Sequence, residues 1–122
     1  MEQYKIFELW LDKHLSNELL PNVQAVNFNL YDASRGEHDF DMQLIGAPKY
    51  DPDDSDWACD AIFTTGEDLC PLKANDWEKC LQVAVGYIRK YIREGRYAYK
   101  ISNLLAVTVG FVDGDLETVI EN

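Results

Sequence analysis

The segment from Leu104 to Val112 restricts the fold more than any other part of this sequence. Apolar residues occupy both its odd and its even positions, which is typical of a strand covered on both faces. Asp113-Gly114 follows directly, and this dipeptide is the strongest two-residue signal for a β-hairpin. From Leu116 to Ile120 apolar and polar residues then alternate, as in a strand with one buried face. The segment therefore predicts a central strand and its hairpin partner.

Three further strands are predicted from alternation of apolar and polar residues. Val26–Tyr31 and Asp39–Leu44 each have this period, and the turn-forming residues 32–37 between them favour an antiparallel hairpin. Trp57–Thr65 shows the same alternation. It would place four side chains on one face, which are those of Trp57, Cys59, Ala61 and Phe63.

Two segments have the period of an amphipathic helix. The first is Glu2–Leu20, which Pro21 would end. The second begins after Asn75 as a capping residue and ends near Gly95. Its apolar stripe consists of Trp77, Cys80, Leu81, Ala84, Val85, Ile88 and Ile92.

These elements define one fold class. The chain has 122 residues, which is the size of one domain. The order α-β-β-β-α-β-β predicts a single α+β domain over residues 1–122. Its mainly antiparallel sheet would have about five strands, with two principal helices packed on it.

The acidic residues are concentrated in the N-terminal part of the chain. The net charge is −11, and residues 1–68 carry 15 acidic and 4 basic side chains, whereas residues 69–122 carry 7 of each. Residues 51–68 contain no Lys or Arg at all. Such a field attracts cationic partners and speeds their association. It argues against binding nucleic acid through its phosphates or a membrane as a cationic surface protein.

No segment resembles a transmembrane helix or a signal peptide, since no run of about 18 apolar residues exists. The three cysteines make an odd number without a CxxC pair, which fits a reducing compartment better than a disulfide scaffold. We therefore expect a cytoplasmic protein.

No catalytic or metal-binding pattern is present. A calcium loop beginning at Asp51 fails because Asp56 stands where glycine is needed and Ile62 where glutamate is needed. The cysteines and histidines lack zinc-finger spacing, and no glycine loop could hold a phosphate. Cys80 and Cys59 are expected to be buried, whereas Cys70, before a proline, is expected in an exposed connection. We expect no catalytic residue, metal or cofactor, and thus not an enzyme.

The densest acidic segment lies between two aromatic residues. Four aspartates stand between Tyr50 and Trp57 in a loop stiffened by Pro52. Aromatic anchors surrounded by charge are typical of protein-binding hot spots, and carboxylates bind Arg and Lys well. Trp57 alone also fits a core position. The predicted partner-binding residues are Tyr50, Asp51, Asp53, Asp54, Asp56, Trp57 and Asp60.

The layout resembles the small acidic immunity proteins of bacterial polymorphic and contact-dependent-inhibition toxin systems. The resemblance is carried by Asp56-Trp57-Ala58-Cys59-Asp60, by the helix beginning at Trp77 and by the hairpin sequence 109–115. It implies a non-enzymatic protein that binds a toxin domain, a cationic partner, and blocks its active site or substrate path. Many such toxins are nucleases with basic clefts, which an acidic surface would occupy.

Two other interpretations stay open. One is a structural or regulatory domain that self-associates, as in a homodimer. It would use either the apolar surface of the exposed sheet or the basic end of the second helix, which could dock the acidic loop of another copy. That end carries Arg89, Lys90, Arg93 and Arg96. The other is a small enzyme that uses an exposed Cys70 or a pair of carboxylates.

Overall fold

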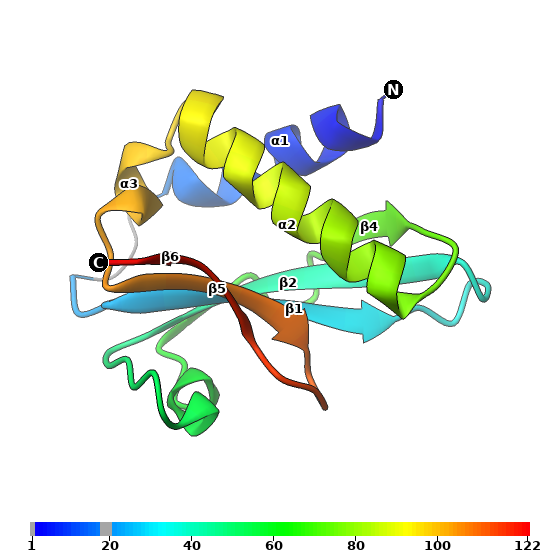
Figure 1. Cartoon of the computed structure of the whole chain (residues 1–122). Coiled ribbons are helices and arrows are strands. Elements are labelled where there is room, and N and C mark those ends of the chain that lie inside the picture. Colours follow the sequence, from blue (N-terminus) through cyan, green and yellow to red (C-terminus); the bar gives the residue numbers. More distant parts are fainter. Residues whose placement is uncertain (1, 18–20) are drawn as a thin grey trace.

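A single mixed sheet lies between a layer of helices and a shorter irregular segment. The computed structural model describes residues 2–17 and 21–122. Over these residues the chain forms three α-helices, one 3-10 helix and six strands, which makes it an α+β protein. Figure 1 shows the α-helices on one side of the sheet and the 3-10 segment on the other.

The helices are α1 (Gln3–Leu15), α2 (Trp77–Glu94) and the short α3 (Tyr99–Ser102). Asp76, rather than Asn75, caps α2 by accepting a hydrogen bond from the Lys79 N–H at 2.8 Å. Gly95 is the C-cap residue. The helices pack through aromatic rings, such as those of Phe7 and Tyr91 with centroids 6.3 Å apart.

The sheet consists of β1 (Ala25–Asp32), β2 (Asp39–Ala47), β3 (Phe63–Thr64), β4 (Cys70–Lys73), β5 (Ala106–Phe111) and β6 (Glu117–Glu121). Its order is β3-β2-β1-β5-β6, with β4 also paired to β2. β1 and β2 form the predicted antiparallel hairpin, in which Phe28 lies opposite Leu44. β1 and β5 are parallel, and Ala25 lies opposite Ala106.

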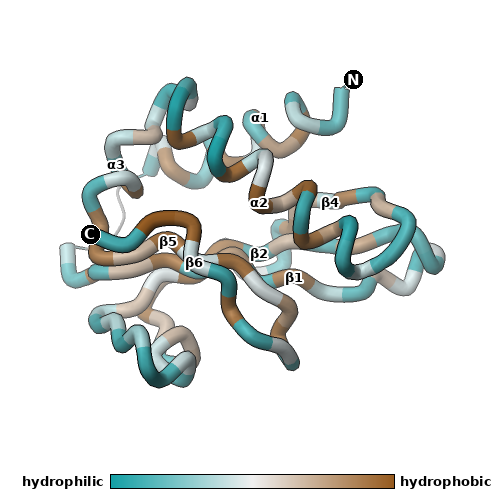
Figure 2. Tube along the Cα trace, viewed as in Figure 1, coloured by the Kyte–Doolittle hydropathy of each residue, from teal (hydrophilic) through white to brown (hydrophobic). Residues whose placement is uncertain are grey.

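The two faces of the sheet have different characters. Apolar side chains such as Phe28, Met42 and Val109 form the main core with the helices. The other face carries a hydrogen-bonded polar row, in which the Thr108 hydroxyl donates to Asn27 and the Asn27 amide donates to Asn29. Figure 2 shows apolar residues gathered between helices and sheet, and hydrophilic ones on the outer turns of the 3-10 segment.

The first helix is shorter than predicted. It ends at Leu15, where the Ser16 N–H still bonds to the Asp12 carbonyl, and Ser16 and Asn17 lie outside the helix. Residues 18–20, which the prediction included, lie outside the described part of the chain.

The strand predicted over Trp57–Thr65 is wrong. Residues Ser55–Cys59 form a 3-10 helix, η1, and only Phe63–Thr64 pair with β2. The Asp54 side chain accepts a hydrogen bond from the Asp56 N–H and so caps η1, which directs the backbone away from extended geometry. Cys59, predicted to be buried, is exposed because the chain does not alternate there.

The connection predicted over residues 66–74 contains the edge strand β4. Met42 lies opposite Cys70 and Phe40 opposite Leu72, so Cys70 is buried under α1 and not exposed. Pro71 lacks an N–H, which is tolerated because β4 is paired on one side only.

The C-terminal hairpin is present, but its connection spans residues 112–116, which we call the hairpin loop, instead of two residues. Gly110 makes this loop possible. A Cβ atom on Gly110 would lie 2.5 Å from the carbonyl oxygen of Asp115 and 3.2 Å from the Cα of Leu116. The backbone of the hairpin loop can therefore pack against β5 at Gly110 because this residue has no side chain.

Gly110→Ala is expected to lower the free energy of unfolding by about 1–3 kcal/mol, because backbone rather than a movable side chain must shift. Urea denaturation measures this. The control is Gly86→Ala in α2, where an added Cβ atom meets nothing within 4 Å. This substitution should raise the free energy of unfolding by about 0.5–1 kcal/mol, because alanine favours the helix more than glycine does. Equal stability of Gly110→Ala and the wild type would contradict the close approach.

Candidate functional site

Trp57 forms the base of the acidic loop, which is the segment from Tyr50 to Asp60. Its indole is only 3% exposed and packs against three alanines, Ala25, Ala47 and Ala106. The Tyr50 ring meets the indole edge-on, with centroids 5.3 Å apart and planes at 78°. Trp57 is therefore a core residue that supports the acidic loop, and Tyr50 is half-buried beside it.

The four central aspartates of the acidic loop all face solvent. Asp51 accepts a hydrogen bond from the Asp53 N–H at 2.9 Å, and Asp54 accepts one from the Asp56 N–H at 3.0 Å. These local bonds fix the turns of the loop, as aspartate commonly does. The side chains of Asp53 and Asp56 form no hydrogen bond within the described residues, so their carboxylates are available to a partner.

Asp60 differs from the other loop carboxylates because it pairs with Lys49 at 3.0 Å. The hydrogen bond that Lys49 donates to Asp60 raises the pKa of Lys49 above its ordinary value. Both side chains are largely exposed, so this pair adds little stability. Asp54 and Asp51 also raise the pKa of Lys49, so this single cation lies among several carboxylates of the loop.

Tyr50 ties the acidic loop to the last strand. Its hydroxyl donates a short hydrogen bond to Glu121 in β6. Partial burial and this hydrogen bond raise the pKa of the Tyr50 phenol. A hollow of about 300 Å³ opens between the loop and the hairpin loop, bordered by Asp51, Asp53 and Asp115.

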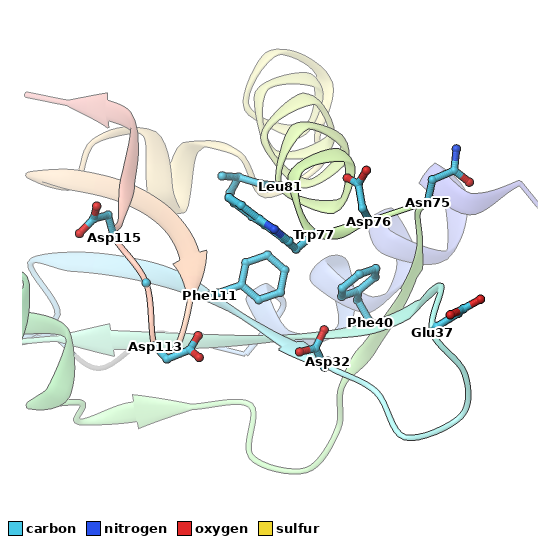
Figure 3. A pocket seen from close by; sticks show the side chains of 11 residues that line it. Asp32, Glu37, Phe40, Asn75, Asp76, Trp77, Leu81, Phe111, Asp113 and Asp115 are labelled. Carbon is cyan, nitrogen blue, oxygen red and sulfur yellow. The ribbon is translucent and has the colours of Figure 1, made fainter.

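A second hollow, which the sequence did not predict, lies where the start of α2 meets the ends of β1 and β5. We call it the aromatic groove. It has a volume of about 540 Å³, and Figure 3 shows the rings of Phe40, Trp77 and Phe111 at its centre. The Trp77 and Phe111 centroids are 6.3 Å apart at 89°, and those of Phe40 and Phe111 are 5.8 Å apart at 74°.

Carboxylates surround the aromatic groove. Those that line it are Asp32, Glu37, Asp76, Asp113 and Asp115. No Lys or Arg is among its lining residues in the described part of the chain. Three basic residues lie near the lining residues in sequence. Arg35 pairs with Asp41 at 2.8 Å and Lys73 with Asp39 at 2.7 Å, whereas Lys79 donates a hydrogen bond to Gln82 at 3.5 Å.

The predicted and the unpredicted hollows are neighbours. Asp115 borders both, so the hairpin loop separates the acidic loop from the aromatic groove. The two hollows and their carboxylates thus form one acidic surface around residues 112–116.

The basic end of α2 lies far from this surface. α2 has 18 residues and spans about 27 Å, with the groove residue Trp77 at its start. Lys90 lies 4.3 Å from the Tyr4 ring centroid and Arg96 lies 5.9 Å from that of Tyr97. The basic end of α2, which we call the basic patch, therefore does not neutralise the acidic surface of its own chain.

The cysteines give no reactive centre of the kind considered from sequence. Burial, together with the nearby carboxylates of Asp41 and Asp68, raises the pKa of Cys70 to about 12. Burial and Asp32 raise the pKa of Cys80 to about 12. Both thiols stay protonated near neutral pH, so neither supplies a thiolate. Cys59 is the exposed thiol among the three.

In residues 2–17 and 21–122, no three His, Cys, Asp or Glu side chains are grouped so that they could hold a metal ion. No helix of the same residues has the length and apolar character needed to cross a membrane.

Comparison with models of protein families, with curated proteins and with solved structures found no match to this chain.

Trp77 is a surface residue, contrary to the prediction from sequence. The apolar stripe of the second helix predicts that it is buried, but the side chain is 57% exposed. Asp76 was the available signal, because a capping residue directly before Trp77 puts that tryptophan in the first turn, at the rim of the helix layer.

Proposed function

We propose that this chain is a cytoplasmic, non-catalytic binding protein whose acidic surface engages a cationic protein. We further propose that it acts as an immunity protein that neutralises a bacterial toxin, in keeping with the resemblance of its sequence. The observation that carries the binding proposal is the acidic loop, whose exposed carboxylates stand on the buried indole of Trp57.

The geometry of the loop favours binding over general solubility. A solubility charge needs no fixed backbone, whereas here two side-chain hydrogen bonds and the Tyr50–Glu121 contact hold the loop in place. A loop that is already ordered loses little conformational entropy when it meets a partner. Its carboxylates thus present a prearranged set of acceptors for Arg and Lys.

The neutralising mechanism follows from charge. A basic cleft that binds a phosphate backbone also attracts this surface, and the acidic loop then occupies the path of the substrate. Long-range attraction speeds the encounter by about 10- to 1,000-fold and weakens as salt screens it. Inhibition therefore requires no reaction on either protein.

We expect Asp53→Asn/Asp56→Asn to slow association with the basic toxin region encoded beside this gene by about tenfold at low salt. Neither carboxylate caps η1 or pairs with Lys49, so the loop should keep its shape. Association rates are measured at about 0.01 M and about 0.15 M ionic strength, where the screening length falls from about 30 to about 8 Å. Loss of toxin activity in the wild-type complex is measured alongside.

The matched control is Glu2→Gln/Glu94→Gln, which removes the same charge from exposed positions on the helix layer. It should leave the association rate within about twofold, since those carboxylates lie outside the acidic surface. If both double variants slow association equally, the net charge of the protein and not the position of the loop carboxylates sets the association rate. A basic neighbour that forms no complex would contradict the proposed function.

The second candidate function is self-association, which the separation of charges along α2 favours. The basic patch of one copy would meet the acidic surface of the next, and such a head-to-tail contact does not close into a dimer by itself. Mass in solution at low and high salt separates the candidates. A mass that rises with concentration at low salt supports self-association, and a monomer under all conditions excludes it.

A further inference from the structure

The aromatic groove contains an exposed tryptophan that the fold does not require. Trp77 lies at the first position of α2, and more than half of its side chain is in contact with solvent. The other two tryptophans, Trp10 and Trp57, are buried. Figure 3 shows the Trp77 indole between Leu81 and the Phe111 ring. Tryptophan at such a position is typical of an anchor for a partner.

The charges around the groove specify what that partner presents. The carboxylates of Asp32, Asp113 and Asp115 form no ion pair with Lys or Arg in the described residues, and the groove is lined by no cation there. Glu37 lies 3.7 Å from His38, which is charged only when protonated. The uncompensated negative potential favours a positively charged occupant.

We propose that the aromatic groove binds the guanidinium group of an arginine side chain from the cationic partner. The groove forms a second contact beside the acidic loop, on the other side of the hairpin loop. The inference rests on the proposed function for the origin of that arginine, but the preference of the groove for a guanidinium can be measured without the partner.

Arginine fits these residues better than lysine. Its guanidinium is planar and weakly hydrated, so it can stack on the Trp77 ring. The same group offers five N–H donors in a fixed fork, which suits hydrogen bonds to carboxylates such as those that line the groove. The ammonium of lysine is more strongly hydrated and lacks the flat face. A neutral aromatic occupant would leave the carboxylates of the groove desolvated and unpaired.

The hollow beside the acidic loop can bind a second cation of the same partner segment. Because Asp115 borders both hollows, a basic segment that crosses the hairpin loop can place one cation in the aromatic groove and another against the acidic loop. Linked contacts of this kind bind more tightly than either contact alone. The groove would then fix the register of the partner.

The direct test is a titration of the ¹⁵N-labelled protein with acetyl-Gly-Arg-Gly-amide, followed by NMR. The indole N–H of Trp77 is expected to shift in a saturable manner, while those of the buried Trp10 and Trp57 stay in place. The same peptide with citrulline, which has the shape of arginine without its charge, should bind about tenfold more weakly. The lysine peptide should fall between the two.

Two variants locate the binding site. Asp113→Asn/Asp115→Asn should weaken binding of the arginine peptide about tenfold. Trp77→Leu should also weaken it, with the backbone N–H of Gly114 as the signal that is followed. Both changes are at exposed positions, so the protein stays folded. The matched control, Glu2→Gln/Glu94→Gln, removes two charges from exposed positions on the helix layer and should leave peptide binding within about twofold.

Equal binding of the arginine and citrulline peptides would overturn the inference, as would an equal loss of binding in the control variant. If the groove shows no arginine preference while the toxin complex remains sensitive to the loop variant, only this inference fails. If the arginine peptide binds as described but no toxin complex forms, the proposed function fails and the groove remains a guanidinium site.

Discussion

Trp57→Ala is expected to lower the free energy of unfolding by about 3–5 kcal/mol. The indole fills the space above Ala25, Ala47 and Ala106, whose methyl groups are too small to close over a cavity. The Tyr50 ring loses its edge-on contact at the same time. Urea denaturation followed by circular dichroism measures the loss.

The control for this prediction is Trp77→Ala, which removes the same side chain from an exposed position and should cost less than about 1 kcal/mol. If both substitutions cost the same, Trp57 is not the base of the acidic loop. In the Trp57→Ala protein below its unfolding midpoint, we also expect the backbone signals of residues 50–60 to broaden, because the main core under the helices is a separate cluster.

Stability is expected to fall steeply at alkaline pH. The pKa values of Cys70 and Cys80 are raised from 9.0 to about 12 in the folded protein, chiefly by burial. Burial also raises the pKa of Tyr4 from 10.0 to about 12, and that of Tyr91 rises for the same reason and through its hydrogen bond to Asp12. Above pH 9 the unfolded chain loses protons that the folded chain retains, so the free energy of unfolding decreases.

The contribution of each raised thiol is fully present below pH 9 and is lost as the pH rises toward 12, with a slope of about 1.4 kcal/mol per pH unit. Urea midpoints between about pH 8 and pH 11 measure this loss. Cys70→Ala/Cys80→Ala should flatten the curve between pH 9 and 10, where the tyrosines contribute least. A wild-type midpoint that stays constant through this range would contradict the prediction.

The elements that follow from local periodicity were predictable. The β1–β2 hairpin was expected because Phe28 and Leu44 alternate with polar neighbours, and these two residues do lie opposite each other. The helix α2 was expected from its apolar stripe, of which Cys80, Ala84 and Ile88 are fully buried. In such elements the spacing of the apolar residues predicts which side chains are buried.

The failures occur where one local interaction outweighs a short pattern. Alternation from Trp57 to Phe63 indicated a strand, but the Asp54 cap bends the chain into η1 and leaves Trp57 as its one buried residue. β4 was missed because a four-residue strand with Pro71 carries almost no periodic signal. Only its pairing with β2 makes it a strand.

The acidic loop was predictable as a charged segment because its residues are contiguous, although its role as a binding site remains a proposal. The aromatic groove was not predictable. Its walls come from residues 32–40, 75–81 and 111–115, which are brought together by the parallel pairing of β1 with β5. Local sequence patterns do not contain the position of one strand relative to a distant one, so the groove emerges only from the fold.

The same parallel pairing has a consequence for synthesis of the chain. Ala25 and Ala106 are neighbours in the sheet, although 80 residues separate them along the chain. Contacts so distant in sequence close late in folding, because the long intervening segment must first lose its freedom. Ala106 is also one of the three alanines against which the Trp57 indole packs. During translation the acidic loop therefore emerges long before its support exists, and a binding-competent surface appears only after β5 has left the ribosome.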